Sequence, residues 1–388
     1  MPPAPPGLRR LLMGAVVVFL GLTLAGVVVL WPSRGTRGRP PSMGAPVRLV
    51  NASVNKVTTG PCVGSPPEMD THCVHADLRI TSGPDKGQRT QIEVGESADQ
   101  PTLHAGQRIV LGRSVEETGH VTYYFSDYQR KTPILLLALL FAVVVVGLAR
   151  WRGAAAIVGL FISLLVLVRF VLPAILDGKS PIAVAIVGSA VIMIFVVYLA
   201  HGVNVRTTTA LLGTALSLLL TGGLAWVFVR ATQLSGLATE EVSYLRASSG
   251  KLSPQGLLLG GIIIGSLGIL NDITVTQASA VWELHLADPS APAAWLYRSA
   301  MRIGRDHIAS TVYTLFLAYA GAALPLLVLF TLTDRGFTEV VTGELVGEEV
   351  VRTLVGSIGL VAAVPITTAL AVALVMRIRG SDTPAPVA

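Results

Sequence analysis

The sequence predicts a polytopic α-helical membrane protein with a small extracytoplasmic β-domain between its first two helices. Hydrophobic residues make up 52% of the 388 residues and charged residues only 13%, whereas soluble domains carry about 25% charged residues. Eight long apolar stretches occur along the chain, and a polar segment with alternating hydrophobicity separates the first from the second. The same composition excludes an intrinsically disordered chain, which needs low hydrophobicity and high charge.

The apolar stretches define the predicted membrane helices, because a hydrocarbon core about 30 Å thick requires about 20 mostly apolar residues per helix. They are residues 11–31, 133–149, 153–175, 181–201, 208–229, 257–282, 307–332 and 351–376. Arg9 and Arg10 precede the first stretch, as basic residues precede a secretory signal. The length of this stretch and the lack of a convincing cleavage site predict an uncleaved membrane helix instead.

Lysine and arginine residues in short loops predict the orientation, since they are retained on the cytoplasmic side. With the N terminus inside, the inner side holds Arg9, Arg10, Arg150, Arg152, Arg206, Arg298, Arg302, Arg305, Arg377 and Arg379. The outer side then holds only Lys179, Arg230, Arg246, Lys251 and Arg335. This distribution predicts a plasma-membrane protein with both termini in the cytoplasm. Its predicted parts are a cytoplasmic tail with the first helix (1–31), an extracytoplasmic β-rich domain (32–132), a seven-helix membrane domain (133–376) and a cytoplasmic C-terminal tail (377–388).

Residues 32–132 have the period-two pattern of β-strands. Apolar and polar residues alternate in the stretches 47–54, 76–80, 90–94 and 107–112. Turn residues, such as those of the segment 82–87, separate these stretches. We therefore expect a small β-domain, such as a five-stranded, OB-like barrel.

The only two cysteines of the chain, Cys62 and Cys73, both fall in this segment. An even pair confined to the compartment in which disulfides persist predicts a bridge between them. The alternative is metal binding, since His72 and His75 lie beside Cys73. The paired spacing of a zinc site with two cysteines and two histidines is absent here, which favours the disulfide.

The stretch 257–282 carries a polar stripe, since residues at steps of three and four share one face of an α-helix. The stripe contains Gly261, Gly265, Gly268, Asp272, Ser279 and Glu283, with Val275 or Thr276 between. Small residues allow a neighbouring backbone to approach closely, and a lone carboxylate in the bilayer is costly. Asp272 therefore predicts a ligand, ion or proton site. Its neighbours in that site are Asn271, Thr274, Thr276, Gln277 and Ser279. The alternative is that Asp272 caps a broken helix beside Asn271.

The stretch 307–332 has a second polar face, which contains Asp306, Ser310 and Tyr313 or Thr314. The cytoplasmic ends of this stretch and of 257–282 bring together Glu283, Arg302, Arg305, Asp306 and His307. We add Asp306, Ser310 and Tyr313, with Glu283, to the candidate binding residues. The alternative is that Arg305 and Asp306 complete the basic cytoplasmic loop and cap the helix, where an acidic first turn is favoured by the helix dipole.

The last stretch, 351–376, contains Pro365, which frees a backbone carbonyl in mid-membrane. The threonines that follow, Thr367 and Thr368, are available to bond such groups. Broken helices often line substrate sites in transporters. On this interpretation the last three predicted helices hold nearly all the buried polar chemistry, and the first five almost none.

Four stretches of the sequence resemble the YibE/F-like family of integral membrane proteins. They are Phe125–Lys131 (FSDYQRK), Gly265–Glu283 (GSLGILNDITVTQASAVWE), Arg302–Pro325 (RIGRDHIASTVYTLFLAYAGAALP) and Glu349–Pro365 (EVVRTLVGSIGLVAAVP). The resemblance implies a multi-pass bacterial membrane protein whose members are at most presumed transporters. It implies no catalytic or binding residues.

The sequence contains no phosphate-binding glycine loop, no His-Glu-x-x-His and no nucleophile elbow. We therefore expect no enzyme and no cofactor, and the absence of a folded basic surface argues against a nucleic-acid partner. Two functions fit. The first is a secondary transporter or channel for a small solute or cation, in which Asp272 binds the coupling ion or proton. The second is a non-transporting scaffold or envelope-assembly partner that binds another protein through its extracytoplasmic domain. In both, the lipid bilayer surrounds the helices.

Overall fold

A computed structural model describes residues 6–33, 48–62, 72–95, 100–115, 119–249, 252–332 and 336–381. The chain divides into two compact units, one formed by Met1–Arg37 with Val146–Ala388 and the other by Gly38–Val145. Of the sequence predictions, the tail residues 382–388 and the outer-loop residues Lys251 and Arg335 lie outside the described residues.

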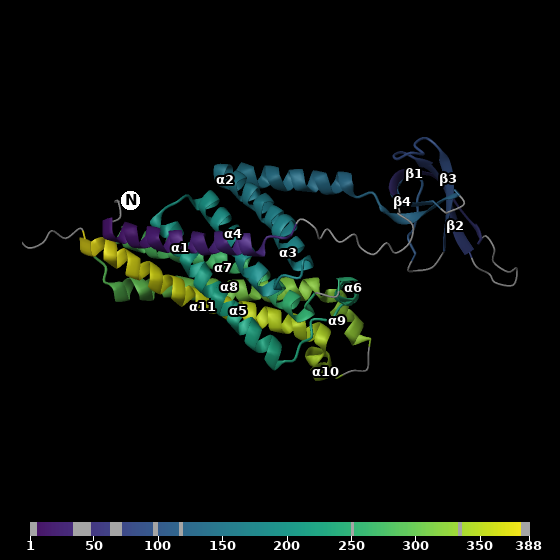
Figure 1. The fold of residues 1–388 in the computed structure, drawn as a ribbon. Helices are drawn as coiled ribbons and strands as arrows, with labels where there is room; N and C mark the ends of the chain where they lie inside the picture. The colour runs from purple at the N-terminus through teal and green to yellow at the C-terminus, as the bar shows by residue number, and fades with distance from the viewer. Residues whose placement is uncertain are drawn as a thin grey trace, which may run out of the picture. The chain divides into compact units, whose positions relative to one another are not determined.

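The larger unit is helical (Figure 1). Its elements are α1 (Pro6–Leu30), α4 (Pro181–His201), α5 (Val205–Ala231), α6 (Glu240–Ser249), α7 (Pro254–Ala287), α8 (Ala293–Ala322), α9 (Leu324–Thr331), α10 (Phe337–Thr342) and α11 (Glu344–Ser381). Helix α2 (Lys131–Val166) enters this unit and continues through a π-helical turn, η1 (Leu167–Val171), into α3 (Leu172–Leu176).

Six helical segments of the described chain are long and apolar enough to cross a membrane, and a bent helix pair makes a seventh. These are the apolar helices of a polytopic membrane protein, as predicted. The stretches 133–149 and 153–175 fall within one segment of 46 residues, Lys131–Leu176. Its backbone leaves helical geometry at Arg150, where φ is 55°. The predicted number of eight crossings therefore stays a prediction.

The bent pair is α8 with α9, whose axes differ by 64°. Helix α8 begins at Ala293, well before residue 307, because the segment 293–306 is amphipathic and buries Leu296, Ala300 and Gly304. The interpretation of Asp306 as a helix cap is therefore wrong. Pro325 lies in the first turn of α9, where its missing N–H costs no helical hydrogen bond.

Helices α5, α7 and α11 pack side by side and form the centre of the helical unit. Buried Leu211 and Leu218 of α5 meet Ile263 and Leu270 of α7 and Val364 of α11 in one cluster. Gly359 of α11 permits this close packing, since a Cβ there would lie only 3.1 Å from Thr221 Cβ of α5.

Helix α5 also carries a run of buried hydroxyl groups. The residues are Thr207, Thr208, Thr209, Thr214, Ser217 and Thr221. The prediction that the first five helices hold almost no buried polar chemistry is therefore wrong for this helix. The hydroxyls of Thr209, Thr214, Ser217 and Thr221 each donate to the carbonyl four residues earlier. These hydrogen bonds within the helix satisfy the hydroxyl groups. The side chains can therefore be buried, although their polar composition alone would predict them on the surface.

The smaller unit contains a curled five-stranded half-barrel sheet. Its strands are β1 (Arg48–Pro61), β2 (His72–Ile80), β3 (Arg89–Gly95), β4 (Arg108–Val115) and β5 (Val121–Tyr128). All neighbours are antiparallel, in the order β3-β2-β1-β4-β5. The predicted turn between β2 and β3 is confirmed, with Gly83 and Gly87 at φ of 88° and 96°, a backbone region that favours glycine. An OB-like barrel stays a prediction.

The two faces of this sheet differ. Ala76 and Leu78 of β2 point to the same side as Ile109 and Leu111 of β4, and all four are fully buried in the core of the unit. Because successive side chains of a strand alternate in direction, Cys73 and His75 lie on the opposite face of β2.

Candidate functional site

The carboxylate of Asp272 on α7 and the imidazole of His307 on α8 face each other across adjacent helices. Asp272 Oδ2 lies 3.8 Å from His307 Nε2. The side chain of Asp272 is 70% exposed and that of His307 35% exposed. Both residues lie within candidate membrane spans. This separation is longer than a hydrogen bond, so the two side chains form an ion pair only when the imidazole is protonated.

Two polar atoms at this position are buried without a hydrogen-bond partner among the described residues. They are Asn271 Oδ1 and His307 Nε2. Buried polar atoms are nearly always hydrogen-bonded, so each exception needs an explanation. A polar group beside Asp272 would satisfy His307 Nε2, which faces that carboxylate.

The predicted stripe of small residues lies on an open side of α7. A Cβ on Gly261 or Gly268 would meet no atom within 4 Å in the described part of the chain, and one on Gly265 would meet Tyr319 Oη at 3.5 Å. The close backbone approach that these glycines predict is therefore not made by another described helix. Asp272 is exposed, as are Gly261, Gly265 and Gly268 of the same helical stripe.

Thr274 and Gln277 are fully buried on the opposite side of α7. Thr274 Oγ1 lies 2.5 Å from Thr214 Oγ1 of α5. Gln277 Nε2 donates to the carbonyl oxygen of Ala300 and to Thr368 Oγ1, both at 2.8 Å. These contacts hold α5, α8 and α11 against α7, so they support the site from behind.

Thr276 and Ser279 are half-buried. Ser279 lines a cavity of about 10 Å³ together with His201, Arg206 and Thr207, a size that accommodates one water molecule. At the end of the same stripe, Glu283 Oε1 lies 3.8 Å from an Arg206 guanidinium nitrogen of α5. The stripe thus ends at a polar junction between α5 and α7.

The predicted residues of α8 do not join Asp272. The side chains of Asp306, Ser310 and Tyr313 are exposed and face away from the packed helices. His307, one residue further along the helix, turns toward α7 instead. The sequence places His307 in this region but does not identify it as the partner, because the choice between Asp306 and His307 depends on the rotation of α8 about its axis.

Asp272 lies in the interior of an unbroken helix, since α7 runs from Pro254 to Ala287. It therefore caps no helix end, and the capping interpretation is wrong. Helix α11 is also continuous through Pro365. Thr368 Oγ1 donates to the carbonyl oxygen of Val364 at 2.7 Å, as expected of a threonine beside a proline, whereas Thr367 Oγ1 is buried with no partner among the described residues.

A second, apolar cavity of about 340 Å³ lies beside the α8–α9 bend. Phe316 and Tyr319 of α8, Leu327 of α9 and Leu354 of α11 line it, and Glu349 adds a carboxylate. Glu349 Oε1 accepts a hydrogen bond from an Arg352 guanidinium nitrogen at 2.6 Å. The cavity is therefore largely hydrocarbon-lined, with its one acidic side chain already paired.

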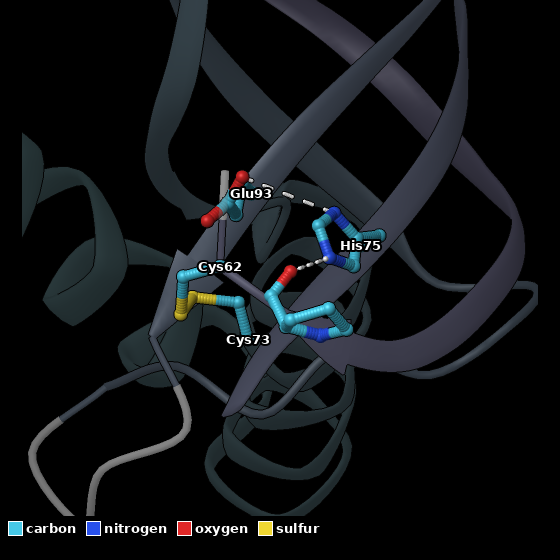
Figure 2. The surroundings of a disulfide bond; sticks show 5 residues. Cys62, Cys73, His75 and Glu93 are labelled. Atoms are coloured by element: carbon cyan, nitrogen blue, oxygen red, sulfur yellow. Dashed lines mark hydrogen bonds and ion pairs between the residues drawn. A yellow bond between two sulfur atoms is a disulfide. The ribbon is translucent and has the colours of Figure 1, made fainter. Parts of the chain in front are cut away.

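In the smaller unit, Cys62 and Cys73 form a disulfide with their Cα atoms 5.0 Å apart (Figure 2). His75 lies beside it, with Nε2 donating to the carbonyl oxygen of Pro61 at 3.1 Å and Nδ1 3.9 Å from Glu93 Oε2. The predicted bridge is thus present in the structure, and the cysteines are not available together as thiolate ligands in this form.

Asp85 joins the β2–β3 turn to strands β4 and β5. Its Oδ2 accepts hydrogen bonds from Arg113 Nε, at 2.6 Å, and from the Tyr123 hydroxyl. The hydrogen bond from Arg113 holds the pKa of the Asp85 carboxyl below its usual value, and the hydrogen bond from Tyr123 makes the next largest contribution. The cluster stabilises the ionised carboxylate and thereby the curl of the sheet.

The apolar helices, with an acid and a base between two of them, define a multi-span helical membrane protein. The family model described as YibE/F-like protein matches residues 137–377, more than half of the chain, so the chain belongs to this family. The match confirms the resemblance of the motifs in α7, α8 and α11. No curated protein and no solved structure is significantly similar to the chain.

Proposed function

We propose that this protein is a secondary transporter or channel for a small solute or ion, and that Asp272 and His307 form its ion- or proton-binding site. The observation that carries the proposal is the 3.8 Å separation of the two side chains on adjacent candidate membrane helices. Charged side chains within membrane spans are costly and usually mark ion or proton pathways.

A structural role accounts poorly for Asp272. The side chain is 70% exposed and makes no helix cap, so it contributes little to packing within the chain. In a bilayer, an exposed carboxylate must face water or another polar group. A hydrated path along the open glycine-lined side of α7 satisfies that requirement, and a solute passing along it would meet Asp272, Asn271 and His307 together.

Ligand chemistry supports a hard cation or a proton at this site. The carboxylate of Asp272 and the amide oxygen of Asn271 are oxygen ligands of the kind that hard cations prefer. The imidazole of His307 is a base that can carry a proton. Protonation of His307 would repel a cation from Asp272, so proton and cation binding would be mutually exclusive, which is one way to couple two fluxes.

The proposal includes a plasma-membrane location, eight crossings and cytoplasmic termini. Lys131–Leu176 contains 46 residues and would extend about 69 Å as one helix at 1.5 Å per residue, about twice the hydrocarbon thickness. The break at Arg150, beside Arg152, supports two crossings with a basic cytoplasmic turn. The excess of Lys and Arg on the inner side supports the orientation. We propose no enzymatic reaction.

The second candidate function is a scaffold that binds an envelope protein through the smaller unit. Its supporting observation is that Gly38–Val145 forms a compact unit of its own, with its own core. In a scaffold, Asp272 would serve the stability or assembly of the helices rather than a ligand.

A thermal-stability screen of the detergent-purified protein separates the two functions. The parent and Asp272→Asn are compared against a set of cations, over a pH series and with a panel of metabolites. A ligand that binds the folded state stabilises it by mass action, by about 2.7 kcal/mol at 100 times its Kd, and thereby raises the melting temperature. The transporter predicts stabilisation of the parent by some ion or solute and none of an equally stable Asp272→Asn. A destabilised variant and an unresponsive parent support the scaffold.

A further inference from the structure

The outer face of the β-sheet gathers metal-ligating groups from three adjacent strands (Figure 2). Cys73 and His75 are two residues apart on β2 and share the face opposite to the core. Glu93 of β3 is the register partner of His75. Cys62 directly follows β1, whose end pairs with the start of β2. The sheet register, and not the spacing along the chain, therefore brings these groups together.

The Glu93 carboxylate lies near both sulfur atoms, which the disulfide bond itself holds together. The two sulfur atoms and a carboxylate oxygen of Glu93 all lie within 4.8 Å of one another. A tetrahedral zinc ion, with bonds of about 2.3 Å to sulfur and 2.0–2.2 Å to oxygen, needs donors about 3.5–3.8 Å apart. Separation of the two sulfurs and a shift of the carboxylate by about 1 Å would produce this geometry.

We propose that the reduced form of this domain binds a zinc-like divalent cation through Cys62, Cys73 and Glu93. In the oxidised form, the Cys62–Cys73 disulfide prevents the two sulfur atoms from binding the cation. A dithiol reductant supplies two electrons and two protons that convert the bridge into two thiols, and is itself oxidised to its disulfide. With a phosphine, which supplies the two electrons, one water molecule supplies the two protons and the oxygen of the phosphine oxide. Cation binding releases the two thiol protons, because the thiolate is the ligand. A solvent molecule fills the fourth position.

His75 is a positioning residue in this site. Its Nε2 donates to the Pro61 carbonyl beside Cys62, and its Nδ1 lies 3.9 Å from Glu93 Oε2, so the protonated ring would attract the carboxylate of β3 toward the end of β1. Residues that orient a metal ligand contribute about 10- to 100-fold in affinity. His72, the other histidine beside Cys73, is not among the grouped donors of the described chain.

Cobalt(II) titration of the full-length protein in detergent tests the site, since a thiolate-bound tetrahedral cobalt ion has a characteristic absorption spectrum. The phosphine-reduced parent is expected to bind one cobalt ion with that spectrum, and zinc to displace it. The oxidised parent is expected to bind at least 100-fold more weakly. Equal binding by the two forms, or a spectrum without thiolate bands, overturns the proposal.

Three variants separate the roles of the residues, and all retain the disulfide, so that their folding is checked in the oxidised form. Glu93→Gln is expected to change the cobalt spectrum and weaken binding. His75→Ala is expected to weaken binding about 10- to 100-fold with an unchanged spectrum. Asp77→Asn, an acidic position on the same face of β2, is the matched control and is expected to bind like the parent. Parent-like affinity in Glu93→Gln overturns the assignment.

Discussion

His307 Nε2 of α8 lies 3.8 Å from Asp272 Oδ2 of α7, and the nitrogen has no hydrogen-bond partner among the described residues. An acid and a base thus lie beside each other on two candidate membrane spans. On the proposed function, an ion or proton bound by these groups would offset the free-energy cost of placing them in an apolar segment.

On the proposed function, ligand binding depends on His307 as well as on Asp272. His307→Gln removes the titratable group but retains a polar side chain, so we expect loss of the pH dependence of ligand binding. The residue is partly exposed, and the variant should melt within about 2 °C of the parent. Thermal shift measurements with the stabilising ligand across a pH series check this. His104→Gln, an exposed histidine of the smaller unit, is the control. An unchanged pH dependence in His307→Gln would contradict the role.

The buried amide of Gln277 is predicted to stabilise the packing behind the site. Gln277→Ala removes the hydrogen bonds to Ala300 and Thr368, which should cost about 1–3 kcal/mol. The melting temperature in detergent should fall by about 2–12 °C. Thr314→Ala is the matched control, because Thr314 is exposed and its hydroxyl bonds within its own helix. Equal melting of the two variants would show that the network contributes no stability.

Glycines on the two sides of the helical centre should respond differently to alanine. Gly359→Ala forces a Cβ against Thr221, and overpacking of this kind costs about 1–3 kcal/mol. Gly268→Ala meets no described atom within 4 Å and should be neutral or stabilising by up to about 1 kcal/mol through helix propensity. Melting temperatures of the two variants check the contrast. If Gly268→Ala destabilises as much, the open side of α7 is packed against another molecule or segment.

The Asp85 cluster predicts a pH dependence of the smaller unit. Because the folded pKa of Asp85 is lowered, its carboxylate stabilises the fold above the unfolded pKa of about 3.9. That contribution is lost as the pH falls from there through the folded pKa. The amide protons of Asp85→Asn should therefore be less protected from hydrogen exchange than those of the parent at pH 7. The difference in protection between the two proteins should shrink below about pH 4. Hydrogen exchange of residues 108–128, compared at equal pH, measures this. A difference that does not shrink as the pH falls below about 4 would contradict the electrostatic origin.

Much of the fold follows from local pattern. The stretch 181–201 coincides with α4, because a continuous apolar run has no competing interpretation. The strands and the Gly83–Gly87 turn follow from alternation and turn chemistry. Local pattern does not predict the burial of residues that depends on tertiary contacts. The hydroxyls of α5 do not interrupt its helix, and nothing in their spacing distinguishes buried from exposed threonines.

The candidate site was predictable only in part. The polar stripe of α7 identifies Asp272, since a carboxylate in an apolar helix is conspicuous. The choice of His307 over Asp306 requires the start and rotation of α8, and an amphipathic first half obscures that start in the sequence. Gln277 resembles its neighbours Thr276 and Ser279 in the sequence, yet the structure buries it against α8 and α11.

The most direct measurement of the central claim is proton or cation flux into proteoliposomes under an imposed potential, with the ion or solute that stabilises the parent present. The parent and Asp272→Asn are reconstituted at equal density, and Glu241→Gln, an exposed acidic position of α6, is the control. We expect flux in the parent and the control and at least a tenfold loss in Asp272→Asn, at matched melting temperatures. Flux in Asp272→Asn equal to that of the parent would contradict the account.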